Sequence, residues 1–199
     1  MISIIVTISN IQLPEPLDQL NTRAIHHREF TAGQALFRQG DKSRGLFYVI
    51  DGALELRRVT EAGHDVLMYR ATSGDTFAEA SLFHRTYHCD AIATERSQVI
   101  ECSRIALLRL YRTDINFALS MSKRFATQIQ QSRMRLEIHS IKSAKERVYR
   151  AIVEGMLRSS ARSLASEIGL SEEAVYRTLG ALSRSGRIRK SGYGRYSSN

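Results

Sequence analysis

Cysteine is scarce in this chain, and long apolar segments are missing from it. Cys89 and Cys102 are the only two cysteines among 199 residues, and their spacing fits neither a disulfide framework nor a zinc site. No apolar run approaches the roughly 20 residues that a membrane-spanning helix needs. Residues 1–9 are apolar but lack a basic leader and a clear cleavage site, so we interpret them as a strand or a disordered lead-in. These absences favour a cytoplasmic protein with no membrane partner.

Acidic residues are the minority, and the excess of positive charge is uneven. The chain is 43% hydrophobic and 25% charged, an ordinary profile for a domain with a sizeable core, and its net charge is +9. Residues 141–199 hold 12 basic and 5 acidic residues, whereas residues 1–140 hold 17 and 15. A basic last third is typical of a nucleic-acid-binding module. A basic tail on a membrane surface is the alternative, but no lipidation motif supports it.

Residues 161–182 have the pattern of two short helices joined by a tight turn. Apolar or small side chains recur at helical spacing before and after Gly169. Gly169 can take a positive φ and end the first helix, and Ser171 can cap the second. The spacing of Ala165, Gly169 and Val175 matches a helix-turn-helix, whose second helix enters the DNA major groove. A plain helical hairpin is the alternative, but the dense basic residues that follow favour DNA recognition.

Residues 29–101 have the alternation and turn signals of an all-β region. Glycine-containing turns recur every five to eleven residues, as in a sandwich or jelly roll. We expect strands over 24–30, 35–39, 45–50, 53–59, 66–71 and 98–103.

Residues 112–140 contain no glycine or proline and change to helical periodicity. Alternating steps of three and four residues form a coiled-coil seam of Ile115, Ala118, Ser122, Phe125, Ile129, Ser132, Leu136 and His139. Leu119, Ala126 and Met134 form a second stripe that can face the β-region. A helix lying on its own β-roll is compatible with that seam. Residues 141–144 are the predicted hinge before an amphipathic helix over 144–156.

The segment 30–83 resembles the cyclic-nucleotide-binding jelly roll of the CRP/FNR transcription regulators. The matching landmarks are Gly33, Gly40-Asp41, residues 46–49, Gly52, Gly63 and Gly74-Asp75. With the helix-turn-helix, the resemblance extends from about residue 23 to 190. It implies an α+β fold: an N-terminal double-stranded β-helix (jelly roll) effector domain over 1–111, a dimerisation helix over 112–140, and a winged helix-turn-helix over 141–199.

The resemblance implies a function as well: a homodimeric transcription regulator, not an enzyme, that reads an inverted repeat in double-stranded DNA and contacts RNA polymerase. Family members read a G·C step through glutamate and arginine positions that match Glu173 and Arg177, which lie four residues apart. Glu172 stands where some members have arginine, which indicates a changed half-site. The full set of predicted DNA-binding residues is Ser171, Glu172, Glu173, Tyr176, Arg177, Arg184, Arg187, Arg189 and Lys190.

The predicted effector pocket matches the family only in part. In nucleotide-binding members a short helix carries a glutamate for the ribose, and an arginine and a hydroxyl residue pair the phosphate. Here the arginine position is Cys89 and the hydroxyl position is Asp90. We therefore predict that cAMP is not a tight ligand. Either the effector is then another, unidentified molecule, or the pocket holds no ligand. The pocket residues by resemblance are Phe77, Ala78, Glu79, Ala80, Cys89, Asp90, Ser132 and Arg133.

A loop that contains His84, Tyr87, His88 and Cys89 could bind a metal ion or haem. A metal-binding cupin would need histidines on strands, and the haem-binding branch of the family places its ligands near Ala78 and Ala80, which cannot ligate. We interpret the loop as solvated. A redox or gas sensor stays an alternative, although Asp90 would raise the pKa of Cys89. No cofactor is predicted.

Overall fold

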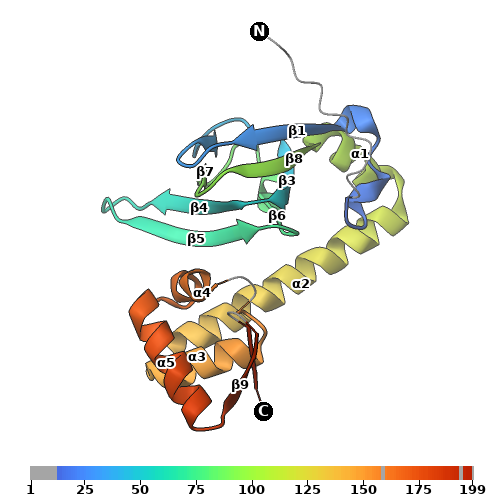
Figure 1. Cartoon of the computed structure of the whole chain (residues 1–199). Helices are drawn as coiled ribbons and strands as arrows, with labels where there is room; N and C mark the ends of the chain where they lie inside the picture. Colours follow the sequence, from blue (N-terminus) through green and yellow to red (C-terminus); the bar gives the residue numbers. More distant parts are fainter. Residues whose placement is uncertain (1–12, 158–159, 193–194, 199) are drawn as a thin grey trace. The chain divides into compact units, whose positions relative to one another are not determined.

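The structure, a computed structural model, describes residues 13–157, 160–192 and 195–198 (Figure 1). The chain divides into two compact units, Met1–Lys123 and Arg124–Asn199, and each is described by itself. The apolar segment 1–9, and residues 193–194 of the predicted wing, lie outside the described residues.

The first unit is a β-roll followed by helices (Figure 1). Two antiparallel sheets have the strand orders β1-β8-β3-β6 and β2-β7-β4-β5. The strands are β1 Ile25–Phe30, β2 Ala35–Phe37, β3 Gly45–Asp51, β4 Ala53–Val59, β5 Asp65–Thr72, β6 Thr76–Phe77, β7 Asp90–Ala93 and β8 Ser97–Ser103. Short 3₁₀-helices are η1 Leu17–Gln19, η2 Thr22–Ala24 and η3 Glu79–Leu82. All six predicted strands are present.

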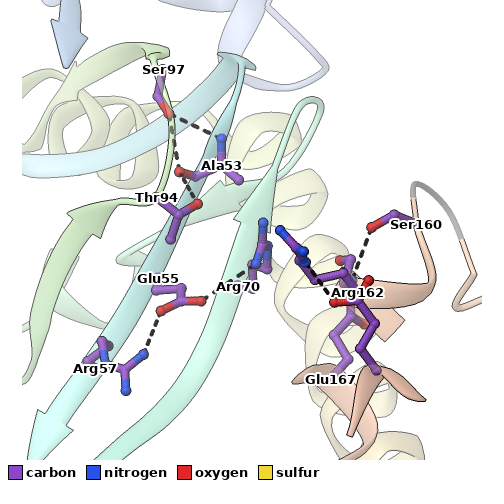
Figure 2. Close-up of polar contacts among 11 residues, drawn as sticks. Ala53, Glu55, Arg57, Arg70, Thr94, Ser97, Ser160, Arg162 and Glu167 are labelled. Atoms are coloured by element: carbon purple, nitrogen blue, oxygen red, sulfur yellow. Dashed lines mark hydrogen bonds and ion pairs between the residues drawn. The ribbon is translucent and has the colours of Figure 1, made fainter. Parts of the chain in front are cut away.

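Each of these eight strands contributes to one shared core between the two sheets. The buried strand residues are Phe30, Phe37, Phe47, Val49, Leu54, Ala71, Phe77, Ala91, Ala93 and Val99. Near the β3–β4 turn, Ala53 is held by polar contacts: its amide donates to Ser97 Oγ at 3.1 Å, and its carbonyl accepts from Thr94 Oγ1 at 3.1 Å (Figure 2). Alternating apolar residues and polar turn contacts therefore produce the jelly-roll sandwich that the sequence predicts.

The interpretation of residues 84–89 as a solvated loop is wrong for two of them. Tyr87 and Cys89 are buried in the shared core, while His84 and His88 are exposed. The chain alternates inward and outward from Tyr87 into β7, because successive side chains of an extended segment point to opposite faces. The pattern Tyr-His-Cys-Asp-Ala-Ile-Ala over 87–93 carries that period, and it was the signal for a strand.

The long helical segment is interrupted near its start. Helix α1 spans Arg104–Thr113 and α2 spans Ile115–Ser140. Asp114 separates them, and its carboxylate accepts hydrogen bonds from the amides of Asn116 at 2.9 Å and Phe117 at 3.1 Å. This side-chain cap satisfies amides at the start of α2 and fixes where it begins.

One face of α2 is apolar and exposed. Ile115 and Leu136 are 71% and 72% exposed, and Ser122 and Ile129 are exposed between them at the same seven-residue repeat. Leu119 is 62% exposed, so it does not pack on the β-region as expected, and Ala126 is exposed in the second unit. The other predicted seam residues are half-buried (Ala118, Phe125) or exposed (Ser132, His139). The buried side chains of α2 are instead Phe117, Met121 and Ile138.

The second unit contains the end of α2 and the helices α3 Ala144–Val153, α4 Ala161–Ile168 and α5 Glu172–Arg184. Strands β9 Ile188–Gly192 and β10 Arg195–Ser198 pair antiparallel. Its core joins all of these helices: Ile138, Val148, Ala151, Ile152, Ala161, Leu164, Ala165, Ile168, Val175, Leu179, Leu182 and Ile188. Of the helices within the described residues, none is both long enough and apolar enough to cross a membrane.

Candidate functional site

The turn between α4 and α5 has the geometry that the sequence predicts. Gly169 has φ 64°, and the amide of Leu170 donates to the carbonyl of Ala165 at 3.0 Å. A side chain at 169 would be strained by that φ, and its Cβ would lie 3.2 Å from the ring of His139. The His139 Nε2 is 2.7 Å from the Glu167 carbonyl oxygen. The end of α2 therefore packs directly on the turn.

Helix α5 begins with a side-chain cap and buries one face. The amide of Ala174 donates to Ser171 Oγ at 3.2 Å, so Ser171 caps the helix as predicted. Val175, Thr178, Leu179 and Leu182 are buried, and the first, third and fourth of these lie in the core of the second unit. The opposite face of α5 is left at the surface.

That surface presents Glu173, Tyr176, Arg177 and Arg184, all of them exposed. In the described part of the chain, Glu173, Arg177 and Arg184 take part in no intramolecular ion pair. Glu172, by contrast, accepts from Arg162 Nε of α4 at 2.8 Å. Two adjacent glutamates in one helical turn thus differ: one is paired with its own chain and the other is available.

The basic residues after α5 also differ in whether they are exposed or paired with their own chain. Ile188 is buried, as expected, while Arg189 and Lys190 are exposed on β9. Arg187 is held on α3: its Nη1 donates to Glu146 at 3.0 Å, and its guanidinium lies 3.7 Å from the centre of the Tyr149 ring. The side-chain hydrogen bond from Arg187 lowers the pKa of Glu146. Arg187 therefore supports the fold of the second unit.

The predicted hinge is tied down by hydrogen bonds that sequence reasoning missed. Arg147 of α3 donates to the carbonyl of Ile141 through Nε at 2.9 Å and Nη2 at 2.6 Å. Its Nη1 donates to the carbonyl of Ile168, at the end of α4, at 3.2 Å. One guanidinium thus joins the segment after α2 to the helix-turn-helix. The division between the two compact units falls inside α2, between Lys123 and Arg124, and the hinge at residues 141–144 stays a prediction.

The interior of the β-roll at the predicted effector site is filled by aromatic rings. Tyr87 stacks on Phe37 at 3.7 Å between ring centres, and Phe47 stacks on Phe77 at 5.2 Å. The Tyr87 hydroxyl accepts from the amide of Arg44 at 3.0 Å, so its polar end is satisfied. Burial raises the pKa of Tyr87.

Cys89 and Asp90 lie on opposite faces of the sheet. Cys89 joins the aromatic core, where burial first and the Asp90 charge second raise the pKa of its thiol. Asp90 accepts from the Gln39 amide and from Arg38, each at 2.7 Å. Burial acts to raise the pKa of Asp90, but the Gln39 and Arg38 contacts outweigh it and the net shift is downward. The two residues therefore do not converge on one ligand atom.

The other predicted pocket residues are also placed. Ala78 is the one non-glycine residue with positive φ among those the structure describes, at 66°, and it precedes η3. Glu79 accepts a hydrogen bond from Thr76, Ala80 is exposed, and Phe77 is buried in the core. Ser132 and Arg133 are exposed on α2, in the second unit. Strain at Ala78 is of the kind that marks functional segments.

Charged residues cover the outer face of the second sheet. Glu55 pairs with Arg57 at 2.6 Å and with Arg70 at 3.6 Å (Figure 2). Asp65 pairs with Arg57 at 2.9 Å. The two carboxylates and two guanidinium groups balance one another in charge, while Nε of Arg70 is buried without a hydrogen-bond partner among the described residues. Among the residues described, no group of three or more histidine, cysteine or acidic side chains could hold a metal ion.

Three comparisons place this arrangement among known proteins. The family model named cyclic nucleotide-binding domain matches residues 27–114. The transcriptional activator protein anr of Pseudomonas aeruginosa is 24% identical, with 89% of this chain and 79% of that protein covered. The cAMP-activated global transcriptional regulator Vfr of the same organism is 22% identical, with 94% and 95% covered. Residues 27–114 thus match a cyclic nucleotide-binding domain, and the chain is similar over most of its length to these two transcription regulators.

The fold of the chain also matches a solved structure. FixK2 from Bradyrhizobium japonicum superposes with a TM-score of 0.69 at 18% identity, covering 88% of this chain and 92% of that one. The combination of a β-roll, a long helix and a helical C-terminal region is therefore a known fold.

Proposed function

We propose that this protein is a homodimeric transcription regulator of the CRP/FNR type, which inserts α5 into the major groove at each half of an inverted repeat in duplex DNA. The observation that carries the proposal is the contrast within α5 and β9. Glu173, Arg177, Arg184, Arg189 and Lys190 are exposed and form no ion pair among the described residues, while Glu172 and Arg187 are held by their own chain. Side chains that contact DNA must be exposed and must not be paired within their own chain. The first of these two groups meets both conditions.

Chemistry assigns roles within the available group. The carboxylate of Glu173 can accept from cytosine N4, and the guanidinium of Arg177 can donate to guanine O6 and N7. They lie four residues apart on one exposed face of α5, so both can reach one G·C-containing step. Arg184, Arg189 and Lys190 are suited to phosphates, and Tyr176 and Ser171 to the backbone or flanking bases.

Pairing of two copies follows from the exposed apolar face of α2. Ile115, Ser122, Ile129 and Leu136 repeat every seven residues, and Leu119 and Ala126 fill the intervening positions of that heptad. Two such faces would be buried against each other in a dimer. We place the seam nearer Leu119 and Ala126, which are exposed, than Ala118 and Phe125, which are half-buried.

The effector is not cAMP in this proposal. A nucleotide phosphate needs a charged or hydrogen-bonding partner in a partly dry site. Cys89 stands at the arginine position, and a cysteine side chain supplies no positive charge because it is either a neutral thiol or a negative thiolate. Arg38, the nearest guanidinium to Asp90, is already committed to that carboxylate. RNA polymerase as a partner and a cytoplasmic location stay expectations from the family resemblance.

Selection of duplexes from a random pool tests the proposal, with a matched pair of variants. Glu173→Gln should change the preferred base at one position per half-site, because an amide has both a donor and an acceptor and can pair with adenine N7 and N6, whereas the carboxylate only accepts. Glu172→Gln, one residue earlier, should leave the selected sequence unchanged, because Glu172 is paired with Arg162. The base-reading role would be contradicted if neither variant changed the selected sequence, or if both changed it equally. The proposed function would be overturned if the native protein selected no motif.

A further inference from the structure

The exposed apolar surface at the start of α2 continues onto two other elements. Phe83, which directly follows η3, is 55% exposed. Its ring meets the ring of Tyr111 of α1 edge to face, at 5.6 Å between centres. The Tyr111 hydroxyl lies 3.0 Å from Ser122 Oγ on α2. Contacts thus run from η3 through α1 to the seam that we assign to the dimer.

These contacts end at Ser122, which lies in the middle of the exposed face of α2 and not at its edge. Ser122 is seven residues from both Ile115 and Ile129, so it belongs to the repeat that defines the exposed face of α2. Leu119 lies one turn before Ser122 on the same face, and it is exposed. Apolar side chains from three elements therefore gather around the hydrogen bond between Tyr111 and Ser122.

The end of η3 is fixed to α1 by a second contact. Arg104 Nε donates to the carbonyl of Leu82, the last residue of η3, at 2.9 Å. Phe83 is therefore a fixed feature of the surface, with a defined position relative to Tyr111. An aromatic side chain that is held in place and half exposed next to an apolar seam is typical of an interface anchor.

We propose that Phe83 and Tyr111 extend the dimer interface beyond α2, and that they are covered by the first half of α2 from a second copy of this chain. The inference rests on the proposed dimer. A second copy is the fitting occupant because the surface is continuous with a self-complementary seam, and a two-fold axis along that seam brings the partner's α2 beside Ser122 of each copy. The segment that carries Glu79 would then touch the partner directly, so a change in η3 alters dimer geometry without passing along α2.

Photo-cross-linking tests the contact in the purified full chain. A photoreactive phenylalanine analogue at position 83 should give a covalent dimer on irradiation. The matched control places it at position 105, because Ile105 is 81% exposed on α1 and lies outside the proposed surface. A covalent dimer from position 83 that is at least several-fold more abundant than from 105 supports the proposal. No dimer from 83, or equal amounts from both positions, would overturn it.

The dissociation constant of the dimer separates this inference from the proposed function. Phe83→Ala should raise that constant about tenfold, the usual effect of removing an interface anchor. Ile105→Ala should leave it unchanged, and Ile129→Ser should raise it, because Ile129 is in the seam itself. A native chain that is monomeric at working concentration means the dimer is wrong. A native dimer weakened by Ile129→Ser but not by Phe83→Ala means that only the extension is wrong.

Discussion

Replacing Arg147 with methionine should destabilise the second unit by about 2–3 kcal/mol. The guanidinium makes three hydrogen bonds to two backbone carbonyls, those of Ile141 and Ile168, at 2.6–3.2 Å. A hydrogen bond from a charged donor contributes about 1.5–3 kcal/mol net, and the paired contacts to Ile141 count as little more than one because they share an acceptor. The half-buried position of Arg147 allows water to replace part of the loss.

Calorimetric unfolding of the full chain measures this effect. For a unit of this size, about 1 kcal/mol corresponds to a shift in Tm of about 4–8 °C, so the variant should lower the transition of the second unit by about 10–20 °C. Methionine keeps the apolar stem of the side chain, so the shift reports the lost donors. Duplex affinity should fall with it, because the end of α2 is no longer held on α4.

Arg150→Met is the matched control on the same helix. Arg150 pairs with Glu154 at 3.0 Å and with Glu137 at 3.8 Å, but its side chain is exposed. An exposed ion pair contributes at most about 0.5–1 kcal/mol, so this variant should shift Tm by only a few degrees. If Arg147→Met shifted Tm no more than Arg150→Met, the role assigned to the two carbonyl contacts would be refuted.

Two further predictions concern the turn and the roll. Gly169→Ala should lower the free energy of unfolding by more than Gly155→Ala, because both residues have positive φ but only a Cβ at 169 meets the His139 ring at 3.2 Å; strain alone accounts for about 1–2 kcal/mol in each, and equal losses in thermal unfolding would remove the His139 contact from the account. Cys89 should react with iodoacetamide at neutral pH only after unfolding, because burial and Asp90 raise the pKa of its thiol; fast labelling of the native chain would favour the redox-sensor alternative.

The architecture was predictable where local signals agree with the tertiary fold. The alternating apolar residues between glycine-containing turns predict strands that the structure contains. The spacing of Ala165, Gly169 and Val175 predicts the two helices α4 and α5 and the turn between them. β7 was not predicted, because the two core residues that precede it, Tyr87 and Cys89 on either side of His88, resemble residues of a ligand-binding loop. The break between α1 and α2 was not predicted. Its cap, Asp114, cannot be told from a polar residue on the exposed face of one continuous helix by the sequence pattern alone.

The register of the seam could not be chosen from the sequence. Ile115, Ser122, Ile129 and Leu136 fit both a three-four and a four-three pattern, so the flanking positions decide between them. Ala118 and Leu119 are both apolar, and only the exposure of Leu119 in the fold shows which of them lies beside the repeat.

The sequence predicts which residues make up the candidate site, but it does not show which of their side chains are exposed and unpaired. Glu172 and Glu173 are equivalent in sequence, and the pairing of Glu172 depends on Arg162, ten residues earlier and across the turn. Arg187 looked like the other basic residues after α5, yet its partners Glu146 and Tyr149 lie on α3. Such pairings are tertiary, so composition and spacing do not contain them.

The most direct test of the account is binding to duplexes that carry two selected half-sites at varied separation. A symmetric dimer that presents two copies of α5 should bind most tightly when the half-site centres are about 34 Å apart, close to 10 base pairs. Affinity should fall steeply when the separation is changed by half a helical turn, since the second half-site then faces away from the protein. Affinity that is independent of the separation, or equal for one half-site and two, would contradict paired recognition by this chain.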